Sequence, residues 1–164
     1  MLWTDGLFKC PTRNATASLL ESPQHVGATN AFMYHFDHAS SFNDKFWGVN
    51  YTMCYGDEVC HAEELTYVFR PDVSIANATY TEGETNLAYA MQAYWTEFAS
   101  IGAPRNGGAI NPMSDTMWSP FVQTPPGYEA SIKFQVDDVV LQDDWDLDHH
   151  KCLFWDTLGY SWLR

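Results

Sequence analysis

Among the six histidines of the chain, His61 has the clearest chemical context, in the sequence VCHAEELTYVF at residues 59–69. It stands at the end of a polar loop and just before a short amphipathic segment. A neutral imidazole there can take the proton of a serine hydroxyl and later return it to a leaving alcohol. This chemistry also requires an orienting carboxylate, an oxyanion hole and a serine in a Gly-x-Ser-x-Gly turn. No Gly-x-Ser-x-Gly occurs in the 164 residues, and taken by itself a lone histidine is more often structural or solvated than catalytic.

Metal chemistry has weaker support. His35 and His38 have a spacing seen in metal sites, but a β-strand would send their side chains to opposite faces. His149-His150 indicates a solvated helix start more than a transition-metal site. The acidic run at 144–148 imitates a calcium loop but lacks the Gly and Glu that such a loop needs at its sixth and twelfth positions. We therefore expect no metal and no cofactor.

Local patterns predict the elements that must position His61. The aromatic run Ala31–Phe36 is typical of a buried strand. A polar loop follows over about residues 37–60, and a loop of this length in a compact domain is usually functional. Residues 63–69 then have the pattern of a short helix that stops before Pro71.

The clearest predicted helix comes next. Thr81 and Glu84 have the spacing of a capping box, and Gly102 followed by Pro104 is a typical helix end. Apolar residues recur at helical spacing between these signals and predict one buried stripe, formed by Leu87, Met91, Tyr94, Trp95 and Phe98.

Other elements are predicted closer to the chain ends. Ser131–Val136 and Val139–Gln142 flank two aspartates, which suggests a hairpin. A last helix is expected to begin near Asp148, which can cap it. A short helical turn is predicted at Thr16–Leu20. One side of the last helix is apolar, with Cys152, Trp155, Leu158 and Trp162.

The composition excludes some classes of function. Eight basic and 21 acidic residues give a formal net charge of −13, which disfavours nucleic acid and anionic lipid because phosphate contacts need Lys and Arg. The charge favours solubility, and attraction of cationic substrates is an alternative. No apolar run is long enough to span a bilayer. The N-terminus has no signal-peptide pattern, so any signal is expected upstream of this chain.

The cysteines and glycosylation sequons favour an oxidising, secretory setting. Four cysteines allow three pairings, and none has zinc-ligand spacing. Asn14, Asn50 and Asn77 each begin an Asn-x-Thr sequon. Chance sequons in a cytosolic protein are the alternative explanation.

Several short segments surround His61 in one order along the chain. Upstream are DGLFKCP at 5–11 and YHFDHAS at 34–40, and His61 itself has a His-x-x-Glu-Leu context. Downstream are YWTEFA at 94–99, GAP at 102–104, WSPF at 118–121 and CLFW at 152–155. Taken together, the chain from about Thr4 to Trp155 resembles the C-terminal part of type-B carboxylesterases and cholinesterases.

This resemblance implies an α/β fold, with residues 1–164 forming a partial, C-terminal portion of an α/β-hydrolase domain. The chain would supply the last central strand, an edge hairpin and packing helices. The triad histidine of the family corresponds to His61, and a recurrent family glutamate, expected to be supporting or structural, corresponds to Glu64. The glycine that usually follows the histidine is Ala62 here, which matters only if the backbone needs a positive φ. His38 matches a recurrent position that is expected to be structural.

The resemblance also implies a disulfide between Cys10 and Cys152. The remaining cysteines, Cys54 and Cys60, would then pair and close a small loop just before His61, which would make that loop more rigid. Trp47 and Tyr55 lie on the same loop. They are candidates to line the substrate pocket, and ordinary loop packing is the alternative.

The implied function is that of a secreted serine carboxylic ester hydrolase acting on small-molecule esters. This chain alone is expected to be inactive, and its partner would be the N-terminal part of the same domain. The alternative is a non-catalytic cholinesterase-like protein used in adhesion or storage.

Overall fold

The computed structural model describes residues 4–21, 30–46, 56–69, 79–105, 113, 116–121, 129–136, 138–142 and 149–160. The chain divides into two compact units. Unit 1 consists of Met1–Met33, Ser119–Ile132 and Leu141–Arg164, and unit 2 consists of Tyr34–Trp118 and Lys133–Val140. Each unit is described separately below.

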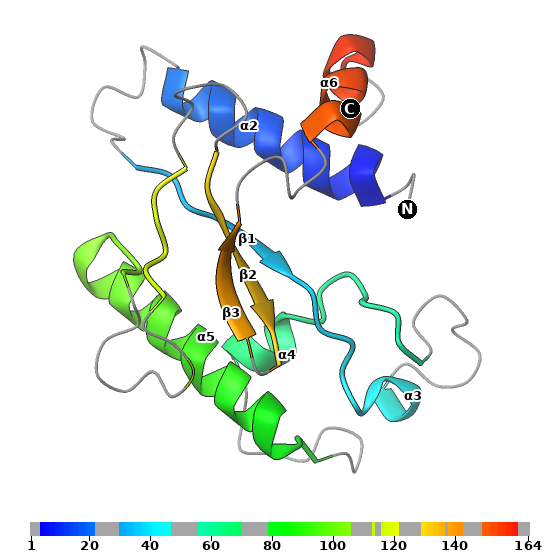
Figure 1. The fold of residues 1–164 in the computed structure, drawn as a ribbon, viewed down its shortest axis with the longest axis vertical. Helices are drawn as coiled ribbons and strands as arrows, with labels where there is room; N and C mark the ends of the chain where they lie inside the picture. The colour runs from blue at the N-terminus through cyan, green and yellow to red at the C-terminus, as the bar shows by residue number, and fades with distance from the viewer. Residues whose placement is uncertain are drawn as a thin grey trace. The chain divides into compact units, whose positions relative to one another are not determined.

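A three-stranded sheet has the order β1-β2-β3. Strand β1 (Met33–Phe36) lies inside the predicted aromatic strand, and β2 (Ser131–Gln135) and β3 (Asp138–Gln142) confirm the predicted hairpin. In Figure 1 the arrows of β1 and β2 run the same way and that of β3 runs back, so the sheet is mixed. The Asp37 N–H donates to the Phe134 carbonyl at 2.8 Å, just beyond the end of β1.

Helix α5 (Glu82–Ile101) is the longest element of unit 2, and it confirms both predicted end signals. The Thr81 side chain accepts from the Glu84 N–H and the Glu84 carboxylate accepts from the Thr81 N–H, while Gly102 closes the helix at φ 73°. Of the predicted apolar stripe, Leu87, Met91 and Tyr94 are buried.

The prediction for Phe98 was wrong, because its side chain is 48% exposed. No residue of α5 after Tyr94 is buried, so the last turns of the helix extend past the packed part of its face. The packed part meets a group of edge-to-face and tilted rings with centroids 5.1–6.4 Å apart, drawn from Tyr34, Tyr94, Trp95, Trp118 and Phe134.

Unit 1 contains the π-helix η1 (Asp5–Lys9), α2 (Cys10–Glu21) and α6 (His149–Leu158). Helix α2 begins well before the turn predicted at Thr16–Leu20. The helical backbone runs without a break from η1 into α2, and Pro11 is the second residue of α2. Figure 1 shows α2 and α6 side by side. A further hydrophobic group in this unit pairs Met33 with Phe121 and is covered by side chains of α2.

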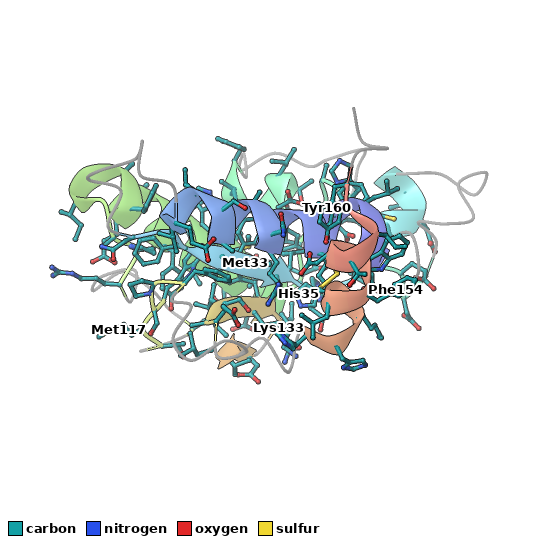
Figure 2. The ribbon with its side chains drawn as sticks, turned by 90° about the horizontal axis from the view of Figure 1, so that it is seen from above. Met33, His35, Met117, Lys133, Phe154 and Tyr160 are labelled. Atoms are coloured by element: carbon teal, nitrogen blue, oxygen red, sulfur yellow. A yellow bond between two sulfur atoms is a disulfide. The ribbon has the colours of Figure 1, made fainter. Side chains whose placement is uncertain are left out.

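Covalent and packing contacts hold α2 and α6 together. The Cys10–Cys152 disulfide joins them with a Cα–Cα distance of 5.0 Å, and Figure 2 shows it as a yellow bond beside α6. This is the pairing that the family resemblance implies. Cys152 is buried as expected on α6, but Leu158 is exposed, so the apolar side of this helix is covered at one end only. Trp162 and Asp148 lie outside the described residues.

Candidate active site

His61 opens a turn over residues 61–64 that leads into the short helix α4 (Leu65–Val68). The predicted helix therefore starts two residues later than expected. The His61 side chain is exposed. Ala62 has a φ of 68°, in the left-handed region that a residue with a Cβ rarely adopts. The family glycine at this position thus corresponds to a backbone conformation that glycine adopts without strain.

A buried carboxylate, Glu63, anchors this turn. Its side chain accepts from the Cys60 N–H at 2.8 Å and from the Ser40 N–H at 2.7 Å. Sequence reasoning selected the neighbouring Glu64 and missed Glu63. The available signal was the three-residue spacing from Cys60 to Glu63, which is that of the returning half of a capping box before a short helix.

Glu64 makes a different contact. It is half-buried and accepts a long hydrogen bond of 3.5 Å from the Tyr34 hydroxyl of β1. Burial and then the nearby Glu64 charge raise the pKa of Tyr34 to about 12. A supporting role of Glu64 toward His61 stays a prediction.

The loop after β1 runs against the start of α5 through a second buried carboxylate, Glu84. This carboxylate accepts from the Ser41 N–H at 2.6 Å and from the Ser41 hydroxyl at 2.8 Å, and it lies 3.2 Å from His38 Nε2. Burial alone would raise the pKa of Glu84, but the hydrogen bonds from His38, Ser41 and Thr81 outweigh it and lower the pKa to about 2.

Tyr67 of α4 contacts the loop that follows β1. Its hydroxyl lies 2.8 Å from Ser40 Oγ, and its fully buried ring packs on other rings of unit 2. Burial raises the pKa of the Tyr67 hydroxyl, which keeps it protonated. The rings that contact the Tyr67 ring belong to Phe36, His38, Phe42 and Tyr80. The His61 imidazole is therefore exposed, while buried side chains hold the backbone around it.

The remaining predicted site residues fall into two groups, those outside the described residues and those within them. Trp47, Tyr55, Cys54, Asn50 and Asn77 lie outside the described residues. Cys60 is disulfide-bonded, and no described cysteine is free. Asn14 lies in α2, half-buried, where its side-chain amide donates to Asp156 at 3.4 Å.

The expectation that His149 is solvated was wrong. His149 is buried in unit 1, and its Nδ1 lies 3.2 Å from a guanidinium nitrogen of Arg13. Arg13 also pairs with Glu129 and with Asp156, so this helix start is packed into an ion-pair group. His38 lies beyond the end of β1, in the following loop, so strand alternation does not separate it from His35.

The described part of the chain has neither a metal-binding cluster nor a membrane-spanning helix. Among those residues, no group of three or more His, Cys, Asp or Glu side chains is placed to hold a metal ion. None of the helices within the same ranges combines the length and apolar character needed to cross a membrane.

With this geometry established, comparison with known proteins identifies the family. The model of the Carboxylesterase family matches residues 1–155, nearly the whole chain. This chain therefore belongs to the carboxylesterase family.

Individual relatives agree with this assignment. Bile salt-activated lipase of Bos taurus is 30% identical over 129 residues, which are 77% of this chain and 19% of that protein. The Homo sapiens protein of the same name is 30% identical over 127 residues, 76% of this chain and 15% of that protein. This chain thus spans less than a fifth of the length of these relatives.

The fold has a counterpart among solved structures. Aspergillus niger EstA aligns with a TM-score of 0.63 at 16% identity, over 95% of this chain and 27% of that one. Together with the mixed sheet and its helices, this likeness confirms an α/β-hydrolase fold class.

Proposed function

We propose that His61 is the general base, and then the general acid, of a serine carboxylic ester hydrolase. The observation that carries the proposal is an exposed imidazole on a turn whose backbone is held by the buried Glu63 carboxylate. A catalytic base needs both access to the reacting atoms and a fixed orientation. Membership of the carboxylesterase family supports the reaction class.

In the proposed reaction, His61 takes the proton of a serine hydroxyl as its oxygen attacks the ester carbonyl. The proton then passes to the leaving alcohol, and a water molecule repeats the sequence to release the acid. The serine, its orienting acid and the oxyanion hole are assigned to the rest of the full-length protein. This chain alone would then be inert, because a lone imidazole lacks the other parts.

The proposed substrate is a small-molecule carboxylic ester, and no cofactor takes part in this chemistry. The proposed setting is the secretory pathway, which the Cys10–Cys152 and Cys60 disulfides support. Asn14, Asn50 and Asn77 are the proposed glycosylation sites. At Asn14 the side-chain amide already donates to Asp156, which disfavours modification there.

The test is His61→Ala in the full-length protein, assayed on a chromogenic short-chain ester. We expect kcat to fall by several orders of magnitude with an unchanged melting temperature, because triad members act as a unit. His38→Ala is the control. His38 contacts the buried Glu84 carboxylate, so its loss should lower stability more than turnover.

Near-normal kcat in His61→Ala would overturn the assignment. So would failure of the unmodified protein both to hydrolyse esters and to react with an organophosphonate serine probe. That pair of results would favour a non-catalytic protein of the adhesion or storage kind.

A further inference from the structure

Glu63 is a buried carboxylate in the turn of the candidate base, although the proposed reaction assigns it no part. Its side chain is 2% exposed. An ionised carboxylate is costly to bury unless hydrogen bonds compensate it. Each of its oxygens accepts a backbone N–H: Oε1 from Ser40 and Oε2 from Cys60.

These two bonds join the turn of His61 to a second segment that is itself fixed. Cys60 directly precedes His61 and is disulfide-bonded. Ser40 lies 23 positions from Glu63, in the loop after β1. The next residue, Ser41, is bound to the Glu84 carboxylate at the start of α5. The backbone at His61 is therefore tied through Glu63 to the sheet and to the longest helix of unit 2.

Ala62, the residue after His61, also requires that the backbone of the turn be held in place. Ala62 holds a left-handed φ of 68°, which a residue with a Cβ leaves readily when nothing opposes it. The bond from the Glu63 N–H to the Cys60 carbonyl, at 3.2 Å, closes the turn across His61 and Ala62. The carboxylate and this bond act on the same four-residue segment, Cys60–Glu63.

We propose that Glu63 is a positioning residue for His61. By accepting from Cys60 and Ser40 together, its carboxylate fixes the backbone from which the imidazole projects. Glu63 touches neither substrate nor reacting atoms in this role. The inference rests on the proposed function of His61.

The test compares Glu63→Gln with Glu82→Gln in the full-length protein. Glutamine keeps the size of the side chain but offers one acceptor oxygen and one donor group, so one of the two backbone N–H groups loses its partner. We expect kcat of Glu63→Gln to fall about 10- to 100-fold with KM changed by less than about 2-fold, as for a small misplacement of a catalytic group. Glu82→Gln, at an exposed position in the first turn of α5, should change either value by less than about 2-fold.

Active-site titration with an organophosphonate probe separates positioning from general stability. A positioning role lowers kcat per labelled site and slows labelling, while the final number of labelled sites stays normal. Fewer labelled sites with normal kcat per site would overturn the proposal, since Glu63 would then serve folding alone. Equal losses in Glu63→Gln and Glu82→Gln would also overturn it.

Glu63→Asp is a second test variant, because aspartate keeps two acceptor oxygens on a shorter side chain. We expect it to recover part of the per-site kcat that Glu63→Gln loses. If neither variant yields folded, labelled enzyme, the role is structural and the proposal fails. His61→Ala distinguishes failure of the proposed function from failure of the positioning role. Normal activity in His61→Ala would contradict the proposed function. Loss of activity in His61→Ala, together with normal per-site turnover in Glu63→Gln, would contradict only the positioning role.

Discussion

At the scale of single residues, the turn at His61 depends on conformations that residue types alone only partly reveal. The sequence marked Ala62 as a replacement for the usual family glycine, and the structure gives that position a φ of 68°. The sequence did not identify Glu63, because two adjacent glutamates look alike until the fold decides which one is buried. Glu63 is buried and Glu64 is half-buried.

Ala62→Gly should stabilise the protein slightly. Relief of the left-handed alanine is worth about 1–2 kcal/mol, and the greater freedom of glycine in the unfolded chain offsets about 0.5–1 kcal/mol of that. We expect the free energy of unfolding to rise by about 1 kcal/mol or less, measured by urea denaturation. Ala99→Gly is the matched control at an exposed position of α5, where it should destabilise. Equal destabilisation in both variants would contradict the strain at Ala62.

At the scale of elements, one side chain serves both a helix and a loop. Glu84 completes the capping box of α5 and also binds Ser41 and His38 of the loop after β1. The capping box was evident from the spacing of Thr81 and Glu84. The loop contacts were not, because residues 38 and 41 are too far away in the sequence for local pattern to connect them with residue 84.

This carboxylate should make stability depend on pH in the acid range. The pKa of the Glu84 carboxyl is about 2 in the folded protein, against an ordinary value of 4.5. Since the folded pKa is lowered, the contribution is present above about pH 4.5 and is lost as pH falls toward 2. The contribution is at most about 3 kcal/mol. Urea unfolding of Glu84→Gln at a series of pH values should show lower stability at neutral pH and a weaker loss between pH 4.5 and 2. Parallel curves for the variant and the unmodified protein would refute this.

Elements were predicted correctly where local sequence signals are strong. They were predicted wrongly where contacts with residues distant in the sequence determine the structure. The β2–β3 hairpin and α5 follow from turn residues and caps and were predicted well. Helix α2 was predicted too short, since its stability comes from contacts with α6 and the disulfide more than from its own weak apolar pattern. Phe98 fits the stripe of α5 but lies past Tyr94, the last buried residue of that helix, and His149 is buried where its ring lies 3.2 Å from Arg13.

At the scale of the whole molecule, the ends of the described chain are fastened within unit 1. The Cys10–Cys152 disulfide spans 142 positions, and Arg13 of α2 pairs with Asp156 of α6 beside it. Family resemblance gave the disulfide pairing. The ion pairs could not be read from the sequence, since Arg13 has several acidic candidates and only the packing of α2 against α6 selects among them.

Removing this disulfide should cost substantial stability. Closing a loop of this size is worth about 5 kcal/mol in the chain-entropy limit, and measured values are commonly about 2–4 kcal/mol. Cys10→Ser with Cys152→Ser should therefore lower the melting temperature by several degrees. Peptide mapping without reductant should find the 10–152 link in the unmodified protein. An unchanged melting temperature in the double variant would show that packing alone holds α2 to α6.

The same bond closes residues 10–152 into a covalent ring. A single cut in the backbone anywhere between them opens the ring without releasing a piece. A segment within the ring, such as residues 56–60 before His61, therefore stays connected to the rest of the chain when a protease cuts it. In a protease-rich environment, the loops of such a molecule can change in sequence and length without each becoming a point at which the molecule falls apart.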